Sequence, residues 1–273
     1  MIVVEPEGGL GNRLRVIHSA VQLSKATGHS LLVRWVEKRG MMCLYRDLFM
    51  EPDLFTVKDI RRKIFNRVTS YLLSGNLSDI IRKMRYDVIL YNREIQENLH
   101  KKTDFRELVE NRSKIFIKAN QFFFEGDEGF FSPAPSKYIS SRVERIVKNF
   151  DGNTVGIHIR GTDNRKSREM SPVSLFIDKM DYLLTHFPET RFYLSTDSAE
   201  TRKMILNRFG TDKILFQNDI ELSRDSRSGI EDAYIDMLCL SETKKIYGSY
   251  WSSFAAVAGS IGGIEKETLV IGN

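Results

Sequence analysis

The stretch that decides the fold runs from residue 2 to residue 36 and reads IVVEPEGGLGNRLRVIHSAVQLSKATGHSLLVRWV. Its first residues, Ile2 to Glu5, predict a short apolar strand that leads into the glycine loop Gly8-Gly9-Leu10-Gly11-Asn12. Apolar residues then recur at helical spacing until Gly28, a residue type that commonly ends helices. Residues 31–36 predict a second buried strand. Strand, helix and strand in this order favour a parallel α/β sheet.

The second half of the chain repeats this alternation more regularly. Strands are expected at residues 154–159, 191–195, 213–216, 244–247 and 269–271, and helices at 173–186, 198–209, 230–241 and 252–261. Four or five such units in a row predict a second Rossmann-like sheet. Pro133 and Pro135 make segment 130–136 an irregular loop near a domain junction. We therefore expect an α/β chain with two Rossmann-like domains, residues 1–150 and 151–273, and a cleft between them.

The composition limits the classes of protein to which the chain can belong. Of its 273 residues, 41% are hydrophobic and 11% aromatic, which is typical of a folded globular protein and excludes a disordered chain or a coiled-coil rod. No apolar run approaches the ~20 residues of a membrane span, and the start, MIVVEPEGG, lacks the basic leader of a signal peptide. Cys43 and Cys239 form no CxxC or Cys/His cluster, so no structural zinc is expected. The expected location is a reducing cytoplasm.

A basic segment lies in the first half of the chain. The net charge is +5, and residues 58–102 hold eleven Lys or Arg against five Asp or Glu. Apolar residues at helical spacing predict an amphipathic helix over 57–73, and a shorter basic helix is expected over 78–85. Such helices suit either a solvated face or peripheral contact with an anionic membrane. Nucleic acid is not an expected partner, because the aromatic residues of the segment fall at apolar-face positions instead of positions suited to base stacking.

The glycine loop is the first of four segments that follow predicted strands and contain candidate binding or catalytic residues. Glycines let a backbone approach a ligand closely, and the helix start behind them offers amides to a phosphate. The loop looks like the dinucleotide fingerprint GxGxxG, but Leu14 replaces its third glycine and Glu37 lies too far along the chain for the ribose-binding acid. An NAD enzyme is therefore not expected, and a purely structural tight turn is the alternative.

The second and third segments place charges and hydroxyls at strand ends. Strand alternation puts His158 and Arg160 on one face, where two basic side chains suit an anion. An ion pair between Arg160 and Asp163 is the structural alternative. Thr196 and Asp197 end the following strand, and their alternative role is to cap the helix behind them.

The fourth segment combines Asp236, on a predicted helix, with the later sequence Ser252-Ser253-Phe254. Hydroxyls and amides at the start of a helix suit a phosphate group. The simpler reading of Ser252 is an N-cap without a further role.

These segments in this order resemble the motifs of one family. The sequence resembles the fucosyltransferase superfamily, which includes protein O-fucosyltransferases, α1,6-fucosyltransferases of the nodulation type and α1,2-fucosyltransferases. The resemblance is carried by GGLGNR at 8–13, HIRGTD at 158–163, STDS at 195–198, and Asp236 with the Ser-Ser-Phe sequence at 252–254. The α1,2 branch has Gln where this chain has Arg13, and no motif matches over about residues 40–150, so no branch is indicated.

The resemblance implies a GT-B fold, in which two Rossmann-like domains face each other, and a metal-independent, inverting transfer from GDP-fucose. A strict Asp-x-Asp metal motif is absent from the sequence, in agreement. Arg160 is then the expected catalytic residue, because its planar fork stabilises the charge that develops on the departing β-phosphate. Ser252, Ser253 and Phe254 would hold the same phosphates, and His158 would contact the nucleotide or orient Arg160.

The resemblance also assigns further residues to the GDP-sugar donor. Asp236 would recognise guanine, because a carboxylate accepts from both N1–H and N2–H. The other expected donor-binding residues are Gly9, Gly11, Asn12, Arg13, Asp163, Thr196 and Asp197.

The sequence allows alternatives for the catalytic base, the acceptor and the function. Glu7 and Asp163 are the expected alternatives for the catalytic base, and a dissociative route with little help from a base is a third. The acceptor is a glycan, a lipid-linked oligosaccharide or a protein hydroxyl, and decoration of a lipid-linked glycan would suit a bacterial enzyme at the membrane surface. The rival functions are a GT-B transferase for another nucleotide sugar and a non-catalytic nucleotide-sugar-binding protein.

Overall fold

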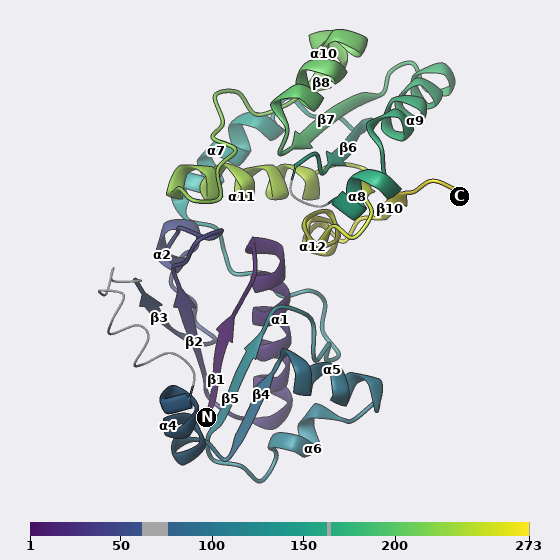
Figure 1. Cartoon of the computed structure of the whole chain (residues 1–273). Helices are drawn as coiled ribbons and strands as arrows, with labels where there is room; N and C mark the ends of the chain where they lie inside the picture. Colours follow the sequence, from purple (N-terminus) through teal and green to yellow (C-terminus); the bar gives the residue numbers. More distant parts are fainter. Residues whose placement is uncertain (62–75, 163–164, 273) are drawn as a thin grey trace. The chain divides into compact units, whose positions relative to one another are not determined.

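The computed structural model describes residues 1–61, 76–162 and 165–272. The chain forms two compact units (Figure 1). Unit 1 comprises Met1–Ser136 together with Arg224–Arg227, and unit 2 comprises Lys137–Ser223 and Ser228–Asn273. Within the described ranges, no helix has both the length and the apolar character needed to cross a membrane.

The division between the units falls earlier than the boundary expected after residue 150. Helix α7 (Lys137–Val147) belongs to unit 2. Its Ile139 is fully buried, and its Arg142 donates hydrogen bonds to Asp232 (2.8 Å) and Gln217 (2.7 Å), which both lie in unit 2. These contacts explain why the irregular segment before α7, and not the loop after it, separates the units.

Unit 1 is built on a parallel sheet with the strand order β3-β2-β1-β5-β4. Its strands are β1 (Ile2–Pro6), β2 (Leu31–Val36), β3 (Thr56–Ile60), β4 (Val88–Tyr91) and β5 (Ile115–Ala119), and its helices include α1 (Leu10–Thr27), α2 (Tyr45–Leu48), α4 (Asn76–Arg85), α5 (Asn92–His100) and α6 (Phe105–Val109). Helix α1 packs on β1 and β2 through Leu14, Ile17 and Val21, which are all buried. It ends at Gly28, whose φ of 69° lies in the left-handed region that glycine tolerates.

The helix expected over 57–73 is wrong in its first residues. Val57 and Ile60 lie in strand β3, which pairs in parallel with β2 from Leu32↔Thr56 to Val36↔Ile60. Pairing with a strand distant in sequence has outweighed the local helical spacing. Residues 62–75 of that expected helix lie outside the described residues. The shorter basic helix expected over 78–85 is present as α4.

Unit 2 contains the second parallel sheet, with the strand order β10-β9-β6-β7-β8. Its strands are β6 (Thr154–Ile159), β7 (Arg191–Thr196), β8 (Ile214–Leu215), β9 (Ile246–Ser249) and β10 (Lys266–Leu269), and its helices include α8 (Arg165–Met170), α9 (Val173–His186), α10 (Ala199–Lys213), α11 (Arg227–Ser241) and α12 (Ser253–Gly262). The second Rossmann-like sheet expected from the sequence is therefore confirmed.

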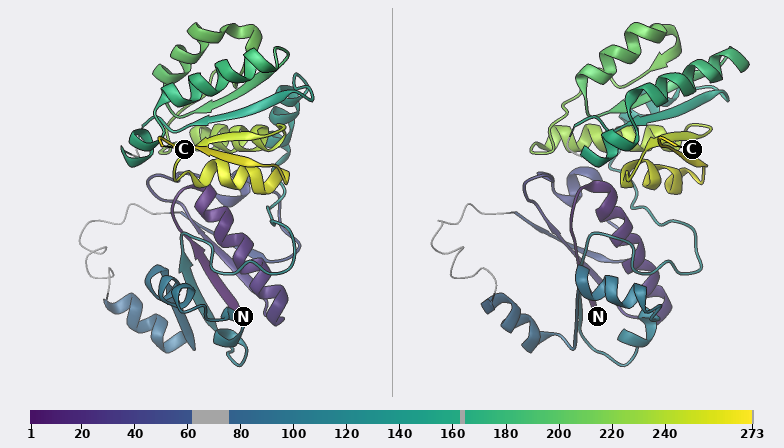
Figure 2. Two further views of the ribbon diagram at one scale, coloured as in Figure 1. Left: turned by 90° about the vertical axis from the view of Figure 1, so that its right-hand side faces the viewer. Right: turned by 45° about the vertical axis from the view of Figure 1, so that its right-hand side comes forward.

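Helices cover both faces of the second sheet (Figure 2). Helices α9 and α10 bury Phe176 and Ile205 in one apolar cluster with Ile157 of β6. On the other face, α11 approaches Gly156 so closely that a Cβ there would lie 2.9 Å from Leu240 Cδ2. Gly248 admits α12 in the same way, because its Cβ would lie 2.8 Å from that of Ala255. The face of α11 and α12 is also the face on which His158 projects.

Each unit buries one thiol. Cys43, after β2 in unit 1, is 1% exposed, and Cys239, on α11 in unit 2, is 0% exposed. Burial raises the pKa of the Cys239 thiol far above its usual value, so this side chain stays neutral.

Candidate functional site

The strand order of unit 2 defines where a ligand is expected. From β6 the sheet continues in one direction through β7 and β8 and in the other through β9 and β10. The direction in which successive strands are added to the sheet therefore changes between β6 and β9. In open α/β sheets, ligands bind at such a switch point, outside the carboxyl ends of the strands. His158, Arg160 and Ser249 all stand at these strand ends.

His158 joins the ends of β6 and α12. Its Nε2 lies 3.0 Å from Ser252 Oγ, and its ring stacks on Phe254 with centroids 4.8 Å apart and planes 21° apart. Both His158 and Ser252 are buried. Ser252 occupies the N-cap position of α12, but its side chain makes no capping hydrogen bond. The simple N-cap reading is therefore wrong for the Ser252 hydroxyl, and the first amides of α12 do not bond to it.

The backbone of Arg160 is held by Ser249, which is not among the site residues expected from the sequence. Arg160 N donates to Ser249 Oγ (3.0 Å), and the Ser249 hydroxyl donates in turn to His158 O (3.4 Å). Ser249 is fully buried, whereas Arg160 is half-buried. Ser249 thus fixes the position from which the guanidinium extends. Its sequence signal is a hydroxyl two residues after the expected strand 244–247 and three residues before Ser252.

Asp197 holds the loop that follows β6. Its carboxylate accepts from Gly161 N (2.6 Å) and from Thr162 Oγ1 (2.7 Å). A Cβ on Gly161 would lie only 2.5 Å from Ser198 Cβ, so the loop can pass this close to the start of α10 only with glycine there. Asp197 is therefore a positioning residue for the loop that carries Arg160.

The expected helix-capping alternative for Thr196 and Asp197 is wrong. Ser198 is the N-cap of α10, and its Oγ accepts from Thr201 N (3.1 Å). Thr196 Oγ1 accepts from Ser198 N at 3.3 Å.

The structure thus brings His158, Arg160, Ser252, Phe254 and Asp197 to one edge of the sheet. We call these five residues the strand-end cluster.

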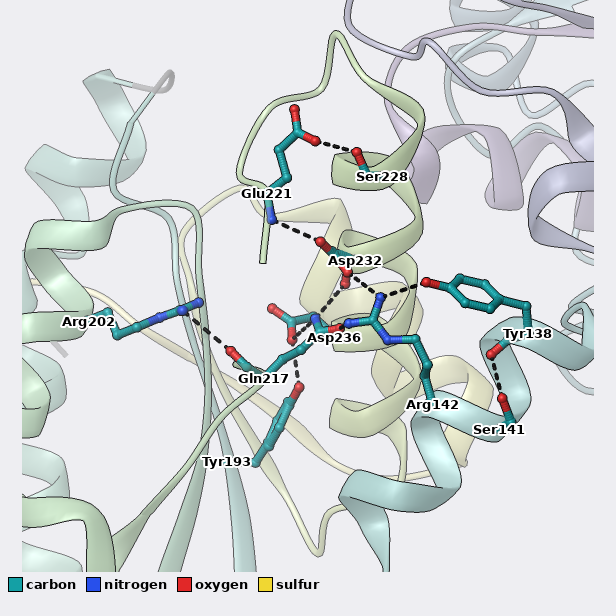
Figure 3. Close-up of polar contacts among 10 residues, drawn as sticks. All are labelled: Tyr138, Ser141, Arg142, Tyr193, Arg202, Gln217, Glu221, Ser228, Asp232 and Asp236. Carbon is teal, nitrogen blue, oxygen red and sulfur yellow. Dashed lines mark hydrogen bonds and ion pairs between the residues drawn. The ribbon is translucent and has the colours of Figure 1, made fainter. Parts of the chain in front are cut away.

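Asp236 has a different environment (Figure 3). It is 5% exposed, and its Oδ1 accepts from Tyr193 OH (2.6 Å) and from Gln217 Nε2 (3.2 Å). Burial raises the pKa of the Asp236 carboxyl to about 6, although hydrogen bonds from Tyr193, Ser195 and Gln217 act in the opposite direction. The carboxylate is therefore part of a buried polar network.

The same network extends to α7. Arg142 donates to both Asp232 and Gln217, and Gln217 Nε2 also donates to Asp232 O (3.1 Å), as Figure 3 shows. Arg142 bonds to Oδ1 of the Asp232 carboxylate, and the second carboxylate oxygen, Oδ2, accepts from Glu221 N (2.9 Å). The network thereby fixes the segment after β8 against α11.

The glycine loop of unit 1 is shorter than expected, because α1 begins at Leu10. Gly9 occupies the N-cap position, where no side chain makes a capping hydrogen bond. Because the helix begins at Leu10, Gly11, Asn12 and Arg13 lie in its first turn. Gly8 has a φ of 78°, and a Cβ there would lie 2.8 Å from Asn12 Nδ2. This turn therefore requires glycine.

Arg13 points into unit 1 and not toward solvent. It is 0% exposed, donates to Gly8 O (3.2 Å) and Val36 O (2.8 Å), and lies 4.5 Å above the Trp35 ring. Burial lowers the pKa of Arg13 to about 10, so it stays charged at neutral pH. Arg13 holds the glycine turn to β2.

Glu7 follows β1 and is paired with two lysines. Lys38 Nζ donates to its Oε1 at 2.9 Å, and Lys118 Nζ lies 3.4 Å from the same oxygen. Partial burial acts to raise the pKa of Glu7, but Lys38 and Lys118 together outweigh it and hold the pKa below its usual value. Asp163, the other expected base, lies outside the described residues. No group of three or more His, Cys, Asp or Glu among the described residues is arranged to hold a metal ion.

The chain has two Rossmann-like units, and its likeness to solved structures shows that the fold is of the GT-B type. Three of the solved structures to which this chain is similar are fucosyltransferases.

Fucosyltransferase NodZ from Bradyrhizobium is 18% identical, with a TM-score of 0.60 over 94% of this chain and 92% of that chain. A point mutant of Arabidopsis thaliana FUT1 in complex with GDP is 15% identical, with a TM-score of 0.61 over 98% and 69% of the two chains. POFUT1 in complex with GDP-fucose is 10% identical, with a TM-score of 0.58 over 98% and 97%. No family model and no curated protein matches the sequence. At these sequence identities the likeness shows the fold. For the fold, it confirms the resemblance to fucosyltransferases that the motifs indicate.

Proposed function

We propose that this protein is a metal-independent, inverting glycosyltransferase that moves L-fucose from GDP-fucose to a hydroxyl group of a glycan. The observation that carries the proposal is the strand-end cluster. It places His158, Arg160 and the start of α12 at the switch point of unit 2, in a chain whose fold is similar to fucosyltransferases crystallised with GDP or GDP-fucose.

The cluster has the chemistry that a leaving diphosphate needs. Arg160 would donate two parallel hydrogen bonds to the β-phosphate, where charge develops as the glycosidic bond breaks. The amides of Ser253 and Phe254 lie in the first turn of α12, a helix end that favours anions. His158, fixed by Ser252 and Phe254, would keep this helix end at its place beside Arg160.

The remaining donor-side residues have supporting roles in the proposal. Asp197 and Thr196 would hold the loop after β6 and the start of α10. Gly9, Gly11 and Asn12 would present the first turn of α1 to the substrates, while Arg13 would keep that turn rigid from inside unit 1.

Asp236 is the proposed recognition residue for guanine, and the structure sets a condition on this role. Its carboxylate is enclosed by Tyr193 and Gln217. Guanine could pair with it only by replacing at least one of these hydrogen bonds. A substitution described in the Discussion separates this role from a purely structural one.

Glu7 is the proposed proton acceptor, although a weak one. Its lowered pKa keeps it ionised at pH 7, as a base must be, but reduces its affinity for the acceptor proton. We propose that departure of GDP runs ahead of proton transfer, so that the acceptor hydroxyl becomes acidic only as it attacks.

We further propose that the acceptor is presented at the cytoplasmic surface of an anionic membrane. The support comes from α4, whose Ile80, Ile81 and Met84 are exposed beside the exposed cations Lys83 and Arg85. A basic helix with an exposed apolar side is suited to lie in a membrane interface.

Nucleotide-dependent thermal stability tests the function. GDP and GDP-fucose should raise the unfolding temperature, and UDP and ADP should not, since a ligand at 100 times its Kd adds about 2.7 kcal/mol of stability. Release of GDP from GDP-fucose in the presence of a glycan panel then tests turnover. Stabilisation by UDP or ADP in place of GDP would indicate another nucleotide sugar. Binding of GDP-fucose with no turnover on any acceptor would favour the non-catalytic alternative.

A further inference from the structure

Trp251 combines two features that are unusual for a tryptophan. Its side chain is 67% exposed, and its φ of 56° lies in the left-handed region that bulky residues rarely adopt. It immediately precedes Ser252, whose hydroxyl pairs with His158 in the strand-end cluster. Among the described residues, backbone of this kind in a non-glycine residue occurs elsewhere only at Lys102 and Asp219.

The residues on both sides of Trp251 are fixed to the interior of unit 2. Tyr250 N donates to Ser171 Oγ (2.8 Å), and the Ser171 hydroxyl donates to Leu269 O. On the other side, Ser252 Oγ lies 3.0 Å from His158 Nε2. With both neighbours held, Trp251 takes up the turn between β9 and α12. Strained backbone of this kind is maintained by its surroundings and is concentrated at ligand sites.

The indole is held in place by contacts on its own surface. The Lys166 ammonium lies 4.9 Å from the centroid of the Trp251 ring, and the Tyr250 ring lies 6.0 Å away at 50°. Lys166 also lies 6.0 Å from the Tyr250 centroid. An exposed indole supplies a large, rigid apolar surface with a polar edge. Such a surface complements the C–H face of a pyranose ring.

The topology of unit 2 indicates which pyranose this is. A diphosphate at the strand-end cluster would lie over β6 and β9, and Asp236, proposed for guanine, bonds to Tyr193 of β7. Trp251 follows β9, so it lies on the side of the phosphates away from β7. In a nucleotide sugar, the hexose is bonded directly to the β-phosphate on the side opposite the nucleoside.

We infer that Trp251 is the stacking platform for the hexose ring of the donor. This inference rests on the proposed function, because it requires a nucleotide sugar with its β-phosphate beside Ser252 and Ser253. A 6-deoxyhexose suits the platform, since its methyl group enlarges the apolar face that meets the indole. Trp251 then positions the anomeric carbon for attack and is a specificity residue for the sugar, not for the nucleotide.

Tryptophan fluorescence offers a direct test, because the chain has two tryptophans and Trp35 is 0% exposed. Quenching of emission by acrylamide, a neutral quencher, therefore reports mainly on Trp251. Saturating GDP-fucose should protect the emission from acrylamide, and saturating GDP should not. Equal protection by GDP and GDP-fucose would place the indole against the nucleotide and overturn the inference. So would unchanged quenching in the presence of bound GDP-fucose.

Two substitutions and a control complete the test. Trp251→Ala should weaken GDP-fucose binding by about three- to tenfold, the range of an aromatic stacking contact, and leave GDP binding unchanged. Trp251→Phe should retain most of the GDP-fucose affinity. Tyr182→Ala, an exposed aromatic residue on α9, is the matched control and should change neither ligand.

The failure modes are distinguishable. Equal weakening of GDP and GDP-fucose by Trp251→Ala, with the fold intact by circular dichroism, would overturn the stacking role while leaving the proposed function in place. Absence of any thermal stabilisation by GDP or GDP-fucose in the unaltered protein would overturn the proposed function itself. Protection that appears only after an oligosaccharide is added to the GDP complex would assign the platform to the acceptor, and would overturn its assignment to the donor.

Discussion

Arg160 has a half-buried side chain on a backbone that is fixed by Ser249 and by the loop held by Asp197. We expect Arg160→Ala and Arg160→Lys each to lower kcat by about 10²–10³, the typical cost of removing one donor that stabilises transition-state charge. Lys keeps the charge but loses the two parallel hydrogen bonds of the guanidinium. Steady-state kinetics with GDP-fucose measures the effect.

Arg168→Lys is a suitable control, since Arg168 is an exposed arginine on α8 in the same unit. It should retain wild-type turnover, and all three variants should keep the wild-type unfolding temperature. Retention of more than half of the wild-type kcat by Arg160→Lys would remove Arg160 from its catalytic role.

The buried Asp236 makes stability depend on pH in a direction opposite to that of a salt-bridged carboxylate. Its pKa is raised by burial from 3.8 to about 6 in the folded protein. The folded state therefore holds this proton more tightly than the unfolded state. Its contribution to stability is fully present below pH 3.8 and is lost as the pH rises through 6.

Asp236→Asn should remove this pH dependence. Between pH 4 and pH 8, the variant should gain up to about 3 kcal/mol in free energy of unfolding relative to wild type, which corresponds to the roughly two-unit shift in the pKa. Urea unfolding of both proteins over this range measures the difference. Asp178→Asn, at an exposed position on α9, controls for general charge effects. A constant difference between wild type and Asp236→Asn at all pH values would contradict the role of burial.

The same variant tests whether Asp236 recognises guanine. If guanine pairs with the carboxylate, Asp236→Asn should weaken GDP binding, because an amide cannot accept from both N1–H and N2–H. Calorimetric titration with GDP at pH 7.5 measures this. Unchanged GDP affinity in a folded variant would restrict Asp236 to its structural network with Tyr193 and Gln217.

Among the elements of unit 2, the strands and the helices α9 to α12 could be predicted within a few residues, because they combine a clear period with start and stop signals, whereas α7 and α8 were not predicted. Helix α9 over Val173–His186 and strand β6 over Thr154–Ile159 agree with the sequence pattern. Strand β3 could not be predicted, since its register with β2 is a contact between distant residues and Val57 and Ile60 also fit a helix. Sequence periodicity describes one element at a time, whereas pairing depends on two.

The same distinction separates the predictable from the unpredictable site residues. His158 and Arg160 could be placed on one face from strand alternation alone. The partnership of Asp197 with Gly161, and that of Ser249 with Arg160, joins different strands and left no local signal beyond a polar residue at a strand end. Arg13 shows the converse, because its residue type suggested a ligand contact but Val36 O and Trp35 draw it inward.

Helix α4 carries the prediction of membrane contact. The protein should co-sediment with anionic vesicles and not with neutral ones, and salt should weaken the binding. Replacing both Lys83 and Arg85 by Gln should reduce the partition coefficient by about 30-fold at low salt, at about 1 kcal/mol for each cation. Replacing Lys101 and Lys102, exposed cations outside the helix, should have a smaller effect. Absence of binding to anionic vesicles at low salt would leave α4 as a solvated helix.

At the scale of the whole molecule, the two-sheet architecture could be predicted because each half supplies its own alternation of strands and helices. The boundary between the units could not be predicted. The sequence of α7 resembles that of any amphipathic helix, and its assignment to unit 2 depends on the hydrogen bond from Arg142 to Asp232, which lies far along the chain. The resemblance in four short motifs was a better guide to the fold than overall sequence identity, which is only 9–18% to fucosyltransferases of similar structure.

A metal-independent reaction is expected of the molecule as a whole. Arg160 and the amides at the start of α12 would supply the charge that a divalent cation supplies elsewhere. Transfer from GDP-fucose should therefore proceed at the same initial rate with and without EDTA. Loss of activity on chelation, restored by Mg²⁺ or Mn²⁺, would contradict this mechanism.

Each unit contains a single buried thiol, so the rate at which a reagent labels that thiol reports how often the unit opens. A thiol reagent can reach Cys43 only when unit 1 opens and Cys239 only when unit 2 opens, so peptide masses after timed labelling report the two opening rates separately. GDP that binds unit 2 should slow alkylation of Cys239, which lies on α11, more than alkylation of Cys43. Equal slowing would mean that the units open as one cooperative body.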